Sequence, residues 1–151
     1  MQEHIDFVEY NAETGVSRMK KSNKYGTFEA VVKLQKEDSD IANRWDGIAF
    51  CEYKIDTMVA KKKMHILHER VNAIRAVIKA IDPPEPGEDD YTWDKLLIQY
   101  HDACERYEKA KSTYNTMKQN YRLLIDNTLG ARRDFRKRAA RLRGYYEDEE
   151  E

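Results

Sequence analysis

From residue 93 to residue 121 every seventh position of the chain is aromatic. The tyrosines of this repeat are Tyr100, Tyr107, Tyr114 and Tyr121, and the same register extends to Trp93 and Thr128. A second series follows these positions by three residues: Leu96, Ala103, Ala110, Met117, Leu124 and Ala131. An alternation of three and four residues keeps one stripe of an α-helix turned toward a partner helix. The repeat therefore predicts a coiled coil with aromatic a positions and mostly small d positions. We interpret the tyrosines as core residues whose hydroxyl groups reach the edge of the seam.

A matching seam precedes the tyrosine repeat. Its members alternate by four and three residues: Ala60, Met64, Leu67, Val71, Ile74, Ile78 and Ile81. The loop that follows is rich in proline, and a residue before proline avoids the α region, so the first helix must end there. Two helices joined by a short loop form an antiparallel hairpin. Aligning Ile81 with Trp93 places Leu67 beside Tyr107.

The sequence therefore predicts an all-α fold: a long antiparallel, coiled-coil-like helical hairpin that oligomerises into a larger bundle. Thr27 and Ser39 are two candidate N-caps for the first helix. The expected boundaries are a short irregular N-terminal arm at 1–26, a first helix from 27 or 39 to 81, a loop at 82–89, a second helix from 90 to 146 and an acidic tail at 147–151. Residues 5–10 fit a short strand or an apolar arm, and we interpret the arm as a segment that orders against another surface.

Charge and hydropathy limit the classes of protein to which the chain can belong. Its 27 basic and 28 acidic side chains nearly cancel, which argues against a globally basic nucleic-acid binder. No apolar run approaches the roughly 20 residues that span a bilayer, and the first residues lack a secretory signal. We therefore expect no membrane partner and a cytoplasmic location. Cys51 and Cys104 form no CxxC pair, so no disulfide framework is expected.

The start of the first helix is apolar around most of its circumference. A helix with more than one apolar face needs more than one neighbour, so this segment predicts a homo-oligomer or membership of a larger assembly. An alternative is that the N-terminal arm folds back over the segment. The residues of this candidate protein interface are Trp45, Ile48, Phe50, Tyr53, Ile55, Met58 and Val59.

The end of the second helix is strongly basic. Guanidinium groups bind phosphates through two parallel donors, so this segment is a candidate site for nucleic acid or another polyanion. Two alternatives remain open, an acidic protein partner and structural pairing with acidic residues of the other helix or of the tail. The residues are Arg132, Arg133, Arg136, Lys137, Arg138, Arg141 and Arg143.

Three histidines and one cysteine form a possible metal site. They are arranged as two pairs, each with a spacing of three residues that places both members on one helix face: His65, His68, His101 and Cys104. In an antiparallel hairpin both pairs lie on the same flank, and three imidazoles with one thiolate suit tetrahedral zinc. The predicted register separates His65 from His101 by about 12 Å along the axis, which favours ordinary flanking residues instead.

Catalytic motifs are missing from the sequence. It contains no glycine-rich phosphate loop, Walker lysine or HExxH motif, and no small-molecule substrate is evident. The sequence therefore predicts a non-enzymatic coiled-coil interaction and assembly protein without a cofactor, whose basic C-terminal helix contacts nucleic acid or another polyanionic partner. The alternatives are a protein-binding scaffold or inhibitor acting through the apolar face at 45–59, and a zinc-binding helical hairpin.

Overall fold

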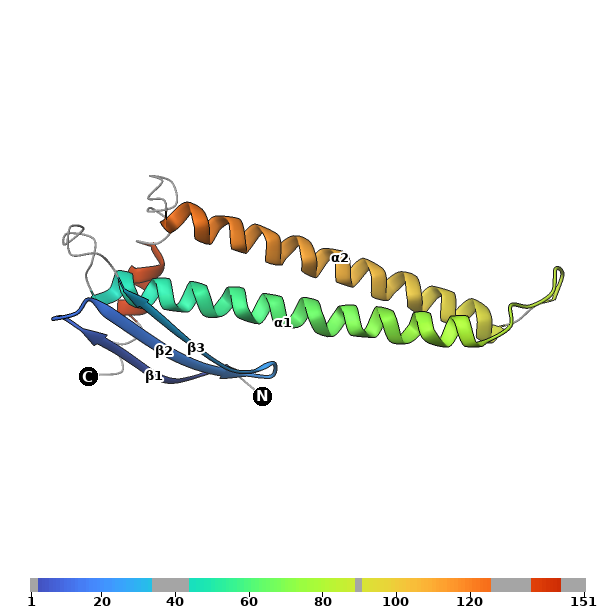
Figure 1. The fold of residues 1–151 in the computed structure, drawn as a ribbon, viewed down its shortest axis with the longest axis horizontal. Coiled ribbons are helices and arrows are strands. Elements are labelled where there is room, and N and C mark those ends of the chain that lie inside the picture. The colour runs from blue at the N-terminus through green and yellow to red at the C-terminus, as the bar shows by residue number, and fades with distance from the viewer. Residues whose placement is uncertain (1–2, 34–43, 89–90, 126–136, 145–151) are drawn as a thin grey trace. The chain divides into compact units, whose positions relative to one another are not determined.

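The computed structural model describes residues 3–33, 44–88, 91–125 and 137–144 (Figure 1). The chain divides into two compact units. The first contains the described residues up to Val59 together with those from Met117 onward, and the second is Ala60–Thr116. The predicted acidic tail lies outside the described residues.

A three-stranded antiparallel sheet occupies the N-terminal region of the first unit (Figure 1). Its strands are β1 (His4–Asn11), β2 (Val16–Asn23) and β3 (Gly26–Lys33), in the order β1-β2-β3. The prediction of an all-α helical hairpin for the whole chain is therefore wrong, because the fold is mixed. The segment expected to be an irregular arm contains two strands, and the segment expected to start the first helix at Thr27 lies in β3.

Two tight turns explain why this segment folds into hairpins. After β1 the side chain of Asn11 accepts hydrogen bonds from the backbone N–H groups of Glu13 (2.9 Å) and Thr14 (3.3 Å). Gly15 then adopts a φ of 73°, which side chains disfavour. Between β2 and β3 the side chain of Asn23 accepts from the backbone N–H of Tyr25 at 2.8 Å. Asparagine and glycine thus reverse the chain within the segment that was predicted to be an irregular arm.

Helix α1 (Arg44–Ala80) begins in the first unit and packs there against the sheet. Met19 of β2 is 0% exposed and Ala30 of β3 is 2% exposed. The buried cluster to which they belong also contains Ile48, Ala49, Cys51, Ile55, Ala139 and Leu142. The last two lie in a short helical segment at 137–144. The core of this unit is therefore built from three parts of the chain that are distant in sequence.

The second unit contains the rest of α1 and the first part of helix α2 (Tyr91–Ile125). The ring of His68 lies 4.9 Å from that of Tyr107, and Arg75 donates a hydrogen bond to the hydroxyl group of Tyr100 at 3.1 Å. From the first pair to the second, the position on α1 rises by seven residues and the position on α2 falls by seven, so the two helices run antiparallel. The predicted alignment placed Leu67 beside Tyr107, one residue away from the contact in the structure.

The inside of the second unit is only partly closed. Val71, Ala103 and Ala110 are its buried hydrophobic residues, whereas Tyr100, Tyr107 and Tyr114 are half-buried. α1 ends at Ala80, shortly before the first proline of the loop, as expected from the restriction on residues that precede proline. Among the described residues, no helix contains a segment long and apolar enough to cross a membrane.

Candidate functional site

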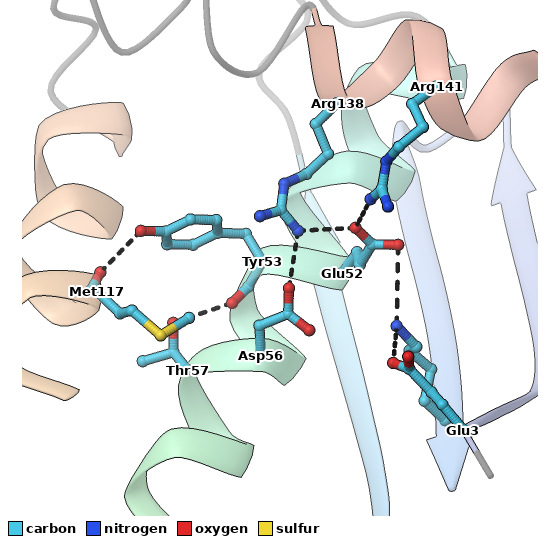
Figure 2. A network of polar contacts seen from close by, with 9 residues as sticks. Glu3, Glu52, Tyr53, Asp56, Thr57, Met117, Arg138 and Arg141 are labelled. Carbon is cyan, nitrogen blue, oxygen red and sulfur yellow. Dashed lines mark hydrogen bonds and ion pairs between the residues drawn. The ribbon is translucent and has the colours of Figure 1, made fainter. Parts of the chain in front are cut away.

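A buried carboxylate on α1 organises the polar contacts of the first unit. The side chain of Glu52 is 6% exposed and receives a hydrogen bond from Arg138 at 2.7 Å and a second one from Arg141 (Figure 2). The ammonium group of Lys21, also 6% exposed, lies 3.8 Å from the other oxygen of the carboxylate. Glu52 therefore joins β2, α1 and the helical segment at 137–144.

The contacts around Glu52 extend to both sides. Arg138 also donates to Asp56 at 2.8 Å, and its guanidinium group lies 4.9 Å from the centre of the Tyr53 ring. The hydroxyl group of Tyr53 donates to the backbone carbonyl of Met117 at 3.4 Å (Figure 2). On the other side, Lys21 forms an ion pair with Glu3. The tyrosine ring is thus held between an arginine and the chain of α2.

An open polar pocket of about 290 Å³ lies among these charged residues. Its lining is Glu3, Lys21, Glu52, Asp56, Arg138 and Arg141. Three cationic groups face three carboxylates, so the pocket has no excess positive charge with which to attract a phosphate. Its chemistry is that of an ion-paired network that fixes the helical segment at 137–144 on α1.

The predicted polyanion site is therefore engaged inside the chain at two of its positions. Arg138 and Arg141 bind Glu52, as in the alternative that pairs the arginines with acidic residues of the first helix. Lys137 and Arg143 are exposed in the same helical segment. The remaining predicted residues, Arg132, Arg133 and Arg136, lie outside the described part of the chain.

Sequence reasoning missed the acidic half of this network. Glu52 and Asp56 are four residues apart and share a face of α1 within a segment that is otherwise mainly apolar. Two carboxylates at this spacing in an apolar segment indicate a partner with positive charge. Lys21 was assigned to an irregular arm, so its inward position on β2 was not foreseen.

The predicted protein interface is covered by the chain's own sheet. Ile48 and Ile55 are 0% and 1% exposed in the buried cluster, and Phe50, Tyr53 and Val59 are half-buried against it. Met58 is also half-buried, and nothing is described of the side chain of Trp45. This arrangement corresponds to the alternative in which the N-terminal segment folds over α1.

The histidines and the cysteine of the possible zinc site do not converge. His65, His68 and His101 are exposed, and Cys104 is half-buried. In the described residues, no group of three or more His, Cys, Asp or Glu side chains is arranged to hold a metal ion. His68 instead lies against the Tyr107 ring, and the ring of His101 lies 6.1 Å from that of Tyr100. These are packing contacts at the edge of the seam.

We expect the two cysteines to differ strongly in reactivity. Cys51 is 0% exposed and its thiol donates to the backbone carbonyl of Ser17 at 3.3 Å. Burial raises the pKa of this thiol to about 11. Since the thiolate is the reactive form, Cys51 should resist a thiol reagent at pH 8 in the folded protein, whereas the half-buried Cys104 should react. Titration with a chromogenic disulfide should give one fast thiol in buffer and two in denaturant. Two fast thiols in buffer would contradict the packing of Cys51.

Several large apolar side chains of the second unit are exposed. On α1 they form part of a stripe at spacings of seven, four and three residues, here called the outer stripe: Ile66, Ala73, Val77 and Ala80. Ile66 is 43% exposed and Val77 is 46% exposed. Ile98 and Tyr91 on α2 are 69% and 81% exposed but lie at outward positions of the heptad. The outer stripe continues a coiled-coil pattern beside the seam, without a neighbour in the described structure.

Comparisons with known proteins give no assignment. No family model, curated protein or solved structure matches the chain. The proposal for its function accordingly rests on the geometry above.

Proposed function

We propose that this chain is a non-enzymatic assembly protein whose helical unit, Ala60–Thr116, packs against a helix of a partner. The observation that carries the proposal is the outer stripe of α1. Its spacing is that of a helix-packing surface, and its two largest side chains are more than 40% exposed. A helix with two apolar stripes needs two neighbours, and α2 supplies only one of them.

The first unit acts in this proposal as a folded base rather than as the binding surface. Its apolar residues on α1 are covered by the sheet, and the arginines of its C-terminal helical segment are paired with carboxylates. Both features leave little for a partner to bind there. Polyanion binding through Arg138 and Arg141 is correspondingly less favoured than helix packing through the second unit.

A reducing compartment is part of the proposal. Cys51 and Cys104 are both free thiols, one buried and one half-buried. Free thiols persist where the cell keeps them reduced, which supports a cytoplasmic location.

Site-specific photocrosslinking in the native host tests the assembly function. A photoreactive residue in place of Val77 should give a covalent adduct of higher mass, because an apolar residue in a packed interface lies against its partner. The matched control is Glu108, which is exposed on α2 and does not belong to the outer stripe. We expect little or no adduct from the control position. Equal adduct formation at both positions, or none at either, would overturn the proposal.

A further inference from the structure

The charges at the two ends of the outer stripe have opposite signs. Lys61, Lys62 and Lys63 are all exposed at the end of the stripe that is nearer to the start of α1. The loop at the other end, residues 82–88, carries three exposed acidic residues and no basic one: Asp82, Glu85 and Glu88. Lys79 in the last turn of α1 offsets one of these carboxylates, so the second end keeps a net negative charge. An apolar stripe with a basic end and a net negative end is complementary to an antiparallel copy of itself.

The midpoint of this charge pattern coincides with a small residue of the stripe. Position 73 lies halfway between Lys61 and Glu85, and it is an exposed alanine. If two copies of α1 cross antiparallel with Ala73 opposite Ala73, then Ile66 faces Ala80 of the other copy. Ile66 thus meets a small residue at each end, Val77 lies level with Glu69 of the other copy, and the alanine at the centre permits close approach of the helices. The same alignment brings Lys61 level with Glu85 twice, once at each end.

We propose that the partner is a second copy of this chain, bound antiparallel through the outer stripe with Ala73 on the two-fold axis. The inference rests on the proposed assembly function and identifies its partner. A parallel arrangement would place the lysines of one copy beside those of the other, and like charges in register disfavour it. Arg70 is the one polar residue at a heptad position within the stripe, and it keeps the association reversible rather than permanent.

Sedimentation equilibrium over a wide range of protein concentration tests the self-association. The wild-type chain should follow a monomer–dimer equilibrium. Val77→Glu should weaken the dimer by about tenfold or more, because in this register position 77 lies level with Glu69 of the other copy and the new carboxylate meets a like charge. Arg70→Leu should strengthen it by a similar factor, since the same position then adds apolar contact. Both residues are exposed, so the circular dichroism of the monomer should be unchanged. The matched control is Ile98→Glu, an equally apolar and more exposed position that lies off the stripe.

Cysteine crosslinking tests the orientation and the register. In a Cys104→Ser background, Ala73→Cys should form a covalent dimer under mild oxidation, because the two thiols meet on the axis. Ile66→Cys alone should not, since its two copies would lie about 21 Å apart along the helix. A covalent dimer from Ile66→Cys but not from Ala73→Cys would overturn the antiparallel register.

The failure of this inference can be distinguished from failure of the proposed function. A chain that stays monomeric at all concentrations, while a photoreactive residue at position 77 still captures a protein of different mass, overturns self-association and leaves the assembly function intact. A monomer without any adduct overturns both. An Ile98→Glu variant that weakens the dimer as much as Val77→Glu overturns the assignment of the interface to the outer stripe.

Discussion

Replacement of Glu52 by alanine should destabilise the first unit by about 3 kcal/mol. The carboxylate is 6% exposed and is the partner of Lys21, Arg138 and Arg141. Without it the ammonium group of Lys21 stays buried, with only the more exposed Glu3 to balance its charge. The helical segment at 137–144 would lose its anchor at the same time. Urea unfolding monitored by far-ultraviolet circular dichroism measures the change in the free energy of unfolding.

Two further variants separate the buried charge from other effects of the substitution. Lys21→Met combined with Glu52→Leu should recover part of the lost stability, because no ammonium group of residue 21 then remains in the interior. The exposed ion pair of Asp102 with Arg106, whose side chains are 50% and 60% exposed, is the matched control. Asp102→Ala should change the free energy of unfolding by less than about 1 kcal/mol. A loss for Glu52→Ala as small as this control would show that the network does not hold the unit together.

The helices could be predicted from the sequence because large apolar and aromatic residues recur at helical spacing. The seam from Met64 to Ile81 and the tyrosine repeat both alternate by three and four, and proline marks the loop between them. The period of each seam is set by residues close in sequence and the short loop sets the antiparallel direction, so local patterns were enough to give the direction and nearly the register. His68, rather than Leu67, lies against Tyr107, so the predicted alignment of the two helices is wrong by one residue.

The sheet could not be predicted in the same way, because the central strand β2 lacks the alternation of apolar and polar residues that marks a half-buried strand. The inward positions of β2 are Ser17, Met19 and Lys21, and only one of them is apolar. An alternation of apolar and polar residues is the main signal for a half-buried strand, and here it is absent. The inward lysine is neutralised by Glu3 and by Glu52, which lies 31 positions further along the chain.

The polar network was equally beyond local patterns. Arg138 is 86 positions away from Glu52, and a contact at this separation has no periodic signal. The sequence indicated a cluster of arginines but not which carboxylates would meet them. The same reason explains why the apolar face around Ile48 was assigned to a partner: its cover is the sheet that the pattern had concealed. Because the contacts between the sheet and α1 were not predicted, this buried face of α1 was predicted to be an exposed interface.

Replacement of Met19 by alanine should destabilise the first unit by about 3 kcal/mol, within the range for large-to-small substitutions in a core. Met19 lies at the centre of the sheet and is 0% exposed, in the same buried cluster as Ile48 and Ile55 of α1. Removing its side chain takes away contacts and leaves a cavity that α1 and the strands can fill only in part. Urea unfolding again measures the loss.

The matched control for this experiment lies on the same sheet. Val31 is on β3, 44% exposed on the opposite face, and Val31→Ala should change the free energy of unfolding by less than about 0.5 kcal/mol. If Met19→Ala is as mild as this control, the sheet does not close over α1, and the residues from Ile48 to Val59 become available to a partner. If Met19→Ala has the full effect, the sheet supplies the second neighbour that the start of α1 requires. In that case the outer stripe is the apolar helix-packing pattern that stays uncovered within the described residues.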